Sequence, residues 1–546
     1  MIAIVIALPI LLTTLIAAAS DQQPFVLKPA GAQLVVVDVF ATDRKGRPVA
    51  SLREEDFELR EDRRVVPIAA FQGPSGVGGE DPGSSKGSAG AARAKRDALT
   101  MIVLVDLRLL TAGGKRRGLA QAAELAERHI EDGGRVVVVT QDESLRPITP
   151  LTGDAGSVHE ALDAIGKLAA RSPSVAEEGN VLDQFEAIVQ SEGCLRGLPQ
   201  LINVVRDYAR WRAIEAQEAR DRLNDVVDAL VGIPGRKALV YVSEGLEQRP
   251  GIQLFDQIGE ICPEILRSDF STVLSAMQEI ETSPVLKDAA ARANAARVTF
   301  YPIDARGLTG QTSMDVSRGN KRYIPSAKND FVRDANLSNP YRTLAEETGG
   351  FALVRGLAPA IATRRLRSEA AGRYVLAFTP ARDPDGRAHD LSVRLKNSKD
   401  VELRHRMSYL HAEPAVVRAQ RALSALFFGL EENGLRATLD ISRSTEKDGE
   451  AVVRLHVPAD ALNAAPESGA RVRVVVALRS LEPEKKGGAS VVREKEFTLK
   501  ADPSPLDPHE VAIRVPVTDA AHDFAVGIED LVNGSTSYFK RTLTKR

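Results

Sequence analysis

The stretch Thr100-Met-Ile-Val-Leu-Val-Asp106-Leu-Arg-Leu-Leu110 contains an unbroken apolar run, Met101 to Val105, that ends in a carboxylate. A half-exposed strand would alternate apolar and polar residues, so this run predicts a buried strand of a parallel sheet. In an open α/β sheet, ligands bind in the crevice at the carboxyl ends of the strands. Asp106 and the four residues after it therefore stand where binding chemistry is expected.

The residues that follow repeat this pattern. Apolar runs begin at Lys237 and Arg297 and end at Ser243-Glu244-Gly245 and at Asp304-Ala-Arg306. Between the runs, residues 118–130, 158–230, 254–296 and 341–348 have helical periodicity. Alternating strands and helices predict an α/β domain over 98–358, with a doubly wound, mostly parallel sheet. Residues 308–340 are polar, which predicts a long irregular insertion at the carboxyl edge of this sheet.

Two β-rich regions flank the predicted α/β domain. A small β module is predicted over 31–72, followed at 73–97 by a Gly-, Ser- and Pro-rich flexible linker. Strands predicted within 359–410 are expected to complete the N-terminal module, because both lack partners. Over 411–546 a linker helix precedes seven short alternating strands, a spacing typical of an immunoglobulin-like β-sandwich.

Charge and composition limit the compartment and the partners. The chain has 72 basic and 74 acidic side chains without a long block of one sign, so neither a nucleic acid nor an acidic membrane surface is an expected partner. Residues 1–20 carry an uncharged apolar run closed by small residues, which predicts either a cleaved export signal or an uncleaved membrane anchor. The expected location is extracytoplasmic, periplasmic or secreted. Cys194 and Cys262 are compatible with one disulfide or with two isolated buried thiols.

Four motifs occur together in one order: residues 43–49 with 56–71, 234–246, 301–308, and 344–350 with 374–376. In this order they resemble the bacterial exported VWFA-related proteins, common in Acidobacteria, over roughly 33–409. The resemblance implies a von Willebrand factor type A (VWA) fold. It also implies a metal-ion-dependent adhesion site, in which an Asp-x-Ser-x-Ser loop, a Thr and an Asp surround Mg²⁺ at the carboxyl edge.

This chain departs from that metal-site pattern. Asp106 matches the first position, but Arg108 and Leu110 stand at the two Ser positions, and Ser243-Glu244 stands where the family has Thr-Asp. Mg²⁺ requires oxygen ligands. The Arg side chain has only N–H hydrogen-bond donors, and the Leu side chain has no polar atom. The sequence therefore predicts a degenerate site that holds no metal, with Asp106, Ser243 and Glu244 as its remnant.

Several arrangements of this edge stay open from the sequence. Arg108 is expected to replace the metal by pairing with Asp106 or Glu244, or else to turn into solvent. Asp106 alternatively caps the helix or loop that follows it. Thr152 is the candidate for the family's Thr.

No His-Glu-x-x-His or phosphate-loop pattern occurs, and no catalytic residue is predicted. The prediction is an exported, non-enzymatic protein that binds a protein or cell-surface ligand through the carboxyl edge, using loops 107–115, 243–251 and 307–340. The candidate edge residues are Asp106, Arg108, Ser243, Glu244, Asp304 and Arg306, although the last two can also pair with each other in a turn. The alternatives are a structural scaffold of an envelope assembly and, with least support, a hydrolase.

Overall fold

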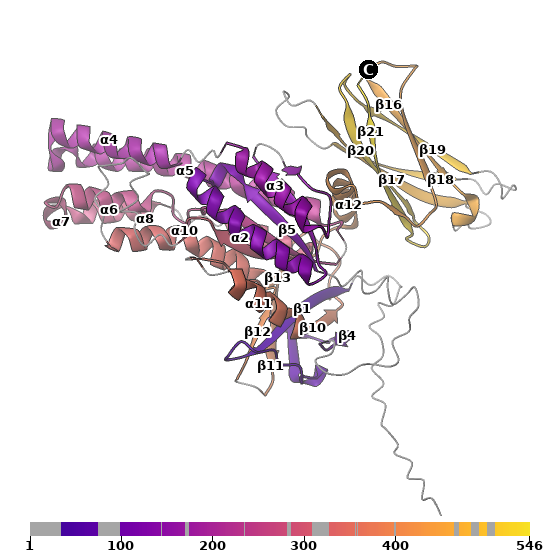
Figure 1. Cartoon of the computed structure of the whole chain (residues 1–546), viewed down its shortest axis with the longest axis horizontal. Helices are drawn as coiled ribbons and strands as arrows, with labels where there is room; N and C mark the ends of the chain where they lie inside the picture. The colour runs from indigo at the N-terminus through magenta and orange to yellow at the C-terminus, as the bar shows by residue number, and fades with distance from the viewer. Residues whose placement is uncertain are drawn as a thin grey trace, which may run out of the picture.

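A computed structural model describes residues 34–74, 99–142, 145–169, 174–233, 235–280, 285–307, 327–354, 356, 359–397, 400–462, 469–481, 491–499 and 508–545. The predicted export segment at 1–20, most of the predicted linker, and residues 308–326 lie outside these ranges. Among the helices that are described, none combines the length and the apolar character needed to cross a membrane. The chain forms a central α/β domain with a helical arm and two β-sandwiches (Figure 1).

The central domain is built on a five-stranded sheet in the order β7-β6-β5-β8-β9. Its strands are β5 (Leu99–Asp106), β6 (Arg135–Gln141), β7 (Leu145–Pro147), β8 (Arg236–Ser243) and β9 (Val298–Asp304). β5 lies in the middle and pairs in parallel with β6 and β8, β9 continues the parallel pairing, and the edge strand β7 is antiparallel. The predicted mixed α/β fold with a mostly parallel sheet is therefore confirmed.

Helices cover both faces of this sheet, which is why β5 is apolar throughout. Met101, Val103 and Val105 belong to the core beneath α2 (Ala112–Glu131), α3 (Ala155–Lys167) and α11 (Pro359–Ala371). Ile102 and Leu104 belong to the opposite core, beneath α5 (Cys194–Leu230), α9 (Val285–Ala295) and α10 (Ala327–Glu347). A strand with both faces buried has no solvent side on which polar residues would be stable.

Two predicted boundaries in this domain are wrong. Residues 327–340 form the first part of α10 instead of an irregular loop. Residues 359–371, placed among the strands of the next region, form α11, because Ala362 and Leu366 lie one helical turn apart and pack on the sheet.

A helical arm extends from the carboxyl edge of the sheet (Figure 1). It consists of α4 (Ser174–Glu192), the first half of α5, α6 (Ile252–Ile261), α7 (Ile265–Ser268) and α8 (Phe270–Glu279). With 37 residues, α5 is about 55 Å long, so its C-terminal half packs on the sheet while its N-terminal half continues beyond it. The arm has its own apolar core, and a disulfide joins Cys194 to Cys262 there with their Cα atoms 5.7 Å apart.

The N-terminal strands pair with those that follow α11. One sheet has the order β12-β1-β10-β4 and the other β13-β11-β2-β3. The strands are β1 (Val35–Asp43), β2 (Phe57–Glu61), β3 (Arg64–Val66), β4 (Ala70–Gln72), β10 (Arg373–Phe378), β11 (Ala388–Leu395), β12 (Val401–His405) and β13 (Ser408–Leu410). Val39 of β1 lies opposite Tyr374 on one side and His405 on the other. The sheets enclose a shared core, so neither segment forms the module alone.

The C-terminal region is a second antiparallel sandwich, with sheets β14-β21-β20-β17-β18 and β15-β16-β19. Its strands are β14 (Glu432–Asn433), β15 (Thr438–Arg443), β16 (Glu450–Val457), β17 (Ala470–Ser480), β18 (Val491–Leu499), β19 (His509–Pro516), β20 (His522–Asp530) and β21 (Thr536–Leu543). Helix α12 (Pro414–Phe428) joins it to the central domain, where Gln420 Nε2 donates to Asp228 Oδ1 of α5 at 2.8 Å. On its other side Arg418 pairs with Glu494 of β18 at 2.8 Å.

Candidate functional site at the carboxyl edge of the sheet

Asp106 ends β5 and is only 2% exposed. Its Oδ2 accepts a hydrogen bond from the Tyr241 hydroxyl at 3.0 Å, and its Oδ1 accepts one from the Arg108 backbone N–H at 3.1 Å. Burial raises the pKa of Asp106, and the charge of Arg222 together with these hydrogen bonds opposes that rise. The carboxylate therefore caps the short 3₁₀ turn η2 (Leu107–Leu109). This is the capping role that the sequence left open for Asp106.

The predicted pairing of Arg108 with Asp106 or Glu244 is wrong. The Arg108 guanidinium lies 3.6 Å from the Glu218 carboxylate of α5, and this pair is partly exposed to solvent. The η2 turn directs the backbone N–H of Arg108 toward Asp106, while its side chain reaches out to α5. Arg108 therefore does not substitute for a metal ion within the edge.

Glu244 contacts the beginning of α2. Its Oε1 accepts a hydrogen bond from the Thr111 hydroxyl at 2.5 Å, and Thr111 Oγ1 accepts one from the Gly114 N–H at 3.1 Å. A Cβ atom at Gly114 would lie 1.7 Å from Glu244 Oε1, so only Gly allows this approach. Thr152, the candidate from the sequence, pairs with Val136 at the amino end of β6, away from this edge.

Two tyrosines fill the space between the remaining polar groups. Ser243 is fully buried, and its hydroxyl is hydrogen-bonded to that of Tyr341 from α10. The Tyr241 and Tyr341 rings meet edge to face with their centroids 6.2 Å apart. Burial raises the pKa of both hydroxyls, so they stay protonated and able to donate. Sequence reasoning missed these residues because a Tyr in an apolar run is indistinguishable from an ordinary core residue.

Asp304 and Arg306 form a buried ion pair after β9. Arg306 Nε lies 2.9 Å from Asp304 Oδ1, and Arg306 Nη2 lies 2.5 Å from Asp304 Oδ2. Arg306 also lies 3.4 Å from Asp334 of α10. Asp304 and Arg306 therefore pair with each other in a turn, as the sequence allowed. Neither side chain is directed at an incoming ligand.

The edge residues do not fit Mg²⁺. The carboxylates of Asp106, Glu244 and Asp304 already accept hydrogen bonds from three different neighbours, and the Ser243 hydroxyl is bonded to Tyr341. An octahedral Mg²⁺ shell requires oxygens that converge on one point and retain free lone pairs. Among the described residues, the carboxylates of Asp106, Glu244 and Asp304 are held by separate partners and do not meet as one ligand set.

Adding millimolar Mg²⁺ is therefore expected to leave the midpoint of thermal unfolding unchanged at constant ionic strength. A ligand present at about 100 times its dissociation constant would stabilise the folded state by about 2.7 kcal/mol. Differential scanning fluorimetry of chelator-treated protein, with Na⁺ salt as the control, measures this. A saturable rise of the unfolding midpoint with Mg²⁺ that disappears in Asp106→Asn would show that this edge does bind Mg²⁺.

Helix α10 also lies across the loop that follows β8. The Arg249 N–H donates to Asn336 Oδ1 at 2.7 Å, and Asn336 Nδ2 donates back to the Arg249 carbonyl at 3.0 Å. Gly245 has φ +119°, and a Cβ atom there would lie 3.0 Å from the Leu337 side chain. The loop 243–251 is therefore largely covered by α10, whose first part, 327–340, belongs to the segment predicted as an irregular insertion.

Ion pairs hold the arm to this covered edge. Arg212 of α5 lies 3.3 Å from Glu247, whose second oxygen accepts a hydrogen bond from the Gly251 N–H at 3.0 Å. Arg333 of α10 forms a two-pronged pair with Glu178 of α4 at 3.0 and 2.6 Å. Bidentate Arg–carboxylate pairs fix geometry as well as charge. The arm therefore leaves the edge in one defined direction.

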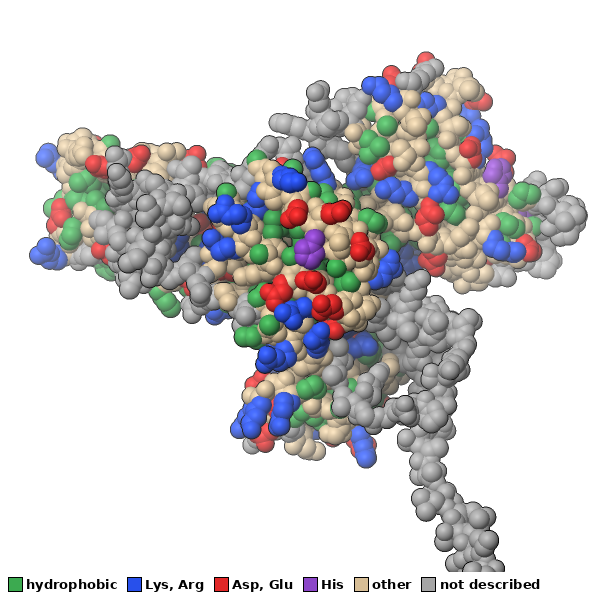
Figure 2. All heavy atoms as spheres, viewed as in Figure 1, with side chains coloured by type: hydrophobic (Ala, Val, Ile, Leu, Met, Phe, Trp, Pro, Cys, Tyr) green, Lys and Arg blue, Asp and Glu red, His purple; other side chains and the backbone are tan. Residues whose placement is uncertain are grey.

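Large apolar side chains are exposed on the arm. Phe270 and Leu274 are 41% and 43% exposed and lie one turn apart on α8, so they share a face. Leu195 on the arm half of α5 is also exposed, as is Phe331 of α10, which lies outside the arm. Figure 2 shows hydrophobic side chains beside charged ones on the arm. Clustered exposed apolar side chains rimmed by polar ones are typical of interaction sites.

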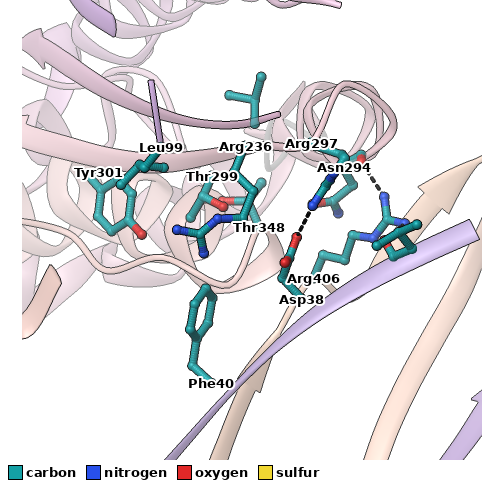
Figure 3. A pocket seen from close by; sticks show the side chains of 12 residues that line it. Asp38, Phe40, Leu99, Arg236, Asn294, Arg297, Thr299, Tyr301, Thr348 and Arg406 are labelled. Atoms are coloured by element: carbon teal, nitrogen blue, oxygen red, sulfur yellow. Dashed lines mark hydrogen bonds and ion pairs between the residues drawn. The ribbon is translucent and has the colours of Figure 1, made fainter. Parts of the chain in front are cut away.

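At the opposite, amino edge of the sheet, arginines surround Asp38 of β1 (Figure 3). Asp38 pairs with Arg297 and with Arg373, each at 3.0 Å. Burial acts to raise the pKa of Asp38, but the charges of Arg297, Arg236 and Arg373 prevail and hold it well below its usual range. Asp38 is therefore a charged link between the N-terminal sandwich and the central domain.

The cavity beside Asp38 is too small for an organic ligand. Its volume is about 30 Å³, whereas each buried water needs about 10–15 Å³. Arg236 lies over the Phe40 ring at 5.7 Å, and Arg406 donates to the Val36 carbonyl at 2.7 Å. Burial lowers the pKa of Arg406 to about 10. We conclude that this cluster is a structural joint between two modules.

Comparisons with known proteins do not identify the chain. No family model and no curated protein matches it. A chicken interferon gamma receptor alpha chain has 11% identity and a TM-score of 0.14, covering 29% of this chain and 66% of the receptor chain. Three N-terminal domains of the type V pili tip protein Mfa5 from Porphyromonas gingivalis have 9% identity and a TM-score of 0.24, covering 78% and 75%. Similarity at this level carries no argument about function.

Proposed function

We propose that this chain is an exported, non-enzymatic recognition protein with a VWA-like central domain, and that it binds a protein or cell-surface ligand through its helical arm. The sheet order β7-β6-β5-β8-β9 with one antiparallel edge strand supports the VWA-like assignment. The Cys194–Cys262 disulfide supports an oxidising compartment, periplasmic or extracellular. An uncleaved anchor at 1–20 is compatible with either location.

The exposed α8 face is the observation that carries this proposal. Phe270 and Leu274 remain in solvent although the arm beneath them has a complete apolar core that includes Val273 and Ala276. The described carboxyl-edge side chains, in contrast, are held in hydrogen bonds and ion pairs within the protein. A rigid surface binds with a smaller loss of conformational entropy than a mobile loop does, and the disulfide and buried ion pairs make the arm rigid.

The double substitution Phe270→Asp with Leu274→Asp is expected to weaken binding at least tenfold, because charges would replace the apolar contacts at an interface core. Quantitative capture from envelope extract, followed by titration of the captured partner, measures this. The matched control is Ile361→Asp with Val416→Asp, which charges two similarly exposed side chains on α11 and α12. Equal affinity for both double variants would contradict the proposal.

A structural scaffold of an envelope assembly is the second candidate. It is favoured by the internal hydrogen bonds of three described edge residues, Asp106, Ser243 and Glu244, which are held by Tyr241, Tyr341 and Thr111. In that case a stoichiometric partner would be captured equally by the wild type and by the α8 variant. The same capture experiment therefore separates the two functions.

A further inference from the structure

Three side chains that commonly bind metals meet at one end of the N-terminal sandwich, remote from the carboxyl edge. They are Asp385 in the turn after β10, His389 of β11 and His411 directly after β13. One ligand atom from each can be chosen so that all lie within 4.8 Å of one another. His389 and His411 are 4% and 3% exposed, while Asp385 is exposed, so the group lies at the surface with a buried base.

The backbone fixes these three residues relative to one another. β11 and β13 are antiparallel neighbours, with His389 opposite Tyr409. Beyond the ladder, the His411 N–H donates to the Arg387 carbonyl and the Gly386 N–H donates to the His411 carbonyl, each at 3.0 Å. The turn that carries Asp385 is therefore tied directly to the segment that carries His411.

His389 lies between two carboxylates. Its Nδ1 is 2.9 Å from Asp62 Oδ2, and its Nε2 is 3.2 Å from Asp385 Oδ1. A neutral imidazole donates from one nitrogen only. If Nδ1 donates to Asp62, the lone pair of Nε2 faces a carboxylate oxygen, and that contact requires either a second proton or a cation.

His411 supplies an independent observation. Its Nδ1 is buried and has no hydrogen-bond partner among the described residues. Buried polar atoms without a partner are rare, and each requires an explanation. The His411 ring centroid lies 6.4 Å from that of His389, at 73° to its plane. His411 therefore adds a buried imidazole with an unpartnered nitrogen to a group that already holds a second imidazole and a carboxylate, which is the composition of a metal ligand set.

We propose that Asp385, His389 and His411 bind a divalent metal ion, and that they prefer Zn²⁺ to Mg²⁺. Two imidazoles and a carboxylate match the ligand preference of zinc, whereas Mg²⁺ takes oxygen ligands. Ligand atoms around tetrahedral zinc lie about 3.3 Å apart, so atoms within 4.8 Å of one another would have to close by at most about 1.5 Å. Three protein ligands leave the fourth position for water or a partner's side chain.

Asp62 acts as a positioning residue in this proposal. Metal-bound histidines usually donate their second ring N–H to a carboxylate, which fixes the ring and the tautomer. Asp62 takes that place at Nδ1 of His389, and the ring stacks on Tyr409 with centroids 5.4 Å apart. The competing explanation is that His389 is doubly protonated and bridges two aspartates without a metal.

Tag-free full-length protein, stripped with chelator and titrated with Zn²⁺ or Co²⁺, tests the site. The expected result is one tightly bound ion per chain, with Co²⁺ giving the intense visible absorption of a tetrahedral site. His411→Ala and Asp385→Asn are expected to abolish this binding, and Asp62→Asn is expected to weaken it about 10–100-fold. His159→Ala, which removes an exposed histidine on α3, is the matched control and should bind like the wild type.

Two results would overturn the proposal. One is a wild-type protein that retains no ion after stripping and titration, which would favour the doubly protonated His389. The other is a Co²⁺ spectrum that is unchanged in Asp385→Asn. Because Asp385 is exposed, this variant should keep the fold, and circular dichroism checks it. The test is therefore decisive even if His411→Ala fails to fold.

Discussion

Replacing Asp38 by Asn is expected to lower the free energy of unfolding by about 3 kcal/mol, because removing one partner of a buried ion pair leaves uncompensated charge. Asp38 faces Arg297 of the central domain and Arg373 of β10, and its side chain is 17% exposed. Asn keeps the shape but removes the negative charge. Equilibrium unfolding in urea, followed by the circular dichroism of the whole chain, measures the change.

The matched control for Asp38 is Asp400→Asn. Asp400 also pairs with an arginine, Arg44, but both side chains are more than 70% exposed. Exposed pairs contribute about 0–1 kcal/mol, so this variant should unfold almost like the wild type. If the two variants lost equal stability, Asp38 would not be the link between the modules.

The pH dependence of the free energy of unfolding is a second test of the role of Asp38. The surrounding arginines hold the pKa of folded Asp38 well below its unfolded value of about 3.9. A lowered pKa means that the contribution to stability is present above about pH 4 and is lost as the pH falls toward the folded pKa. The difference between the wild type and Asp38→Asn should therefore shrink below about pH 4.

Removing the disulfide with Cys194→Ser and Cys262→Ser is expected to destabilise the arm by about 4 kcal/mol. The bond closes a loop between cysteines 68 positions apart, and loop-closure entropy predicts this size of effect. Because α4, α6 and α8 share a core of their own, the loss should be local. Amide hydrogen exchange should show faster opening in the first half of α5, with protection in β5 unchanged.

Reduction of the wild-type disulfide is the complementary control, since it leaves the sequence intact. It should produce the same faster exchange in the arm as the double Ser variant. Unchanged exchange in the arm of both forms would show that the apolar core alone fixes the arm, and that the disulfide is not needed for its rigidity.

The central sheet could be predicted from the sequence because both faces of its strands are buried. The unbroken apolar run of β5 and the repeated runs that end in carboxylates follow directly from that burial. The first part of α10, residues 327–340, could not be predicted in the same way. Its buried positions include Asn336, which is hydrogen-bonded to Arg249, and Ser338, so this part has no apolar period to detect.

The candidate site was less predictable than the fold. The sequence placed Asp106, Ser243, Glu244 and Asp304 at the strand ends, but their partners come from elsewhere in the chain. Tyr341 lies on α10, and Thr111 begins α2. The direction of a long side chain such as Arg108 depends on the turn beneath it, which single-sequence patterns do not specify. The pairing of two cysteines likewise depends on their separation in space.

Site-specific photo-crosslinking tests the central claim most directly. A photoreactive phenylalanine analogue placed at Phe270, in the full chain expressed in its own cell envelope, should give a discrete adduct after illumination. The same analogue at Ile361, which is similarly exposed on α11, should give none. An adduct from position 361 but not from position 270, or none from either, would contradict recognition through the helical arm.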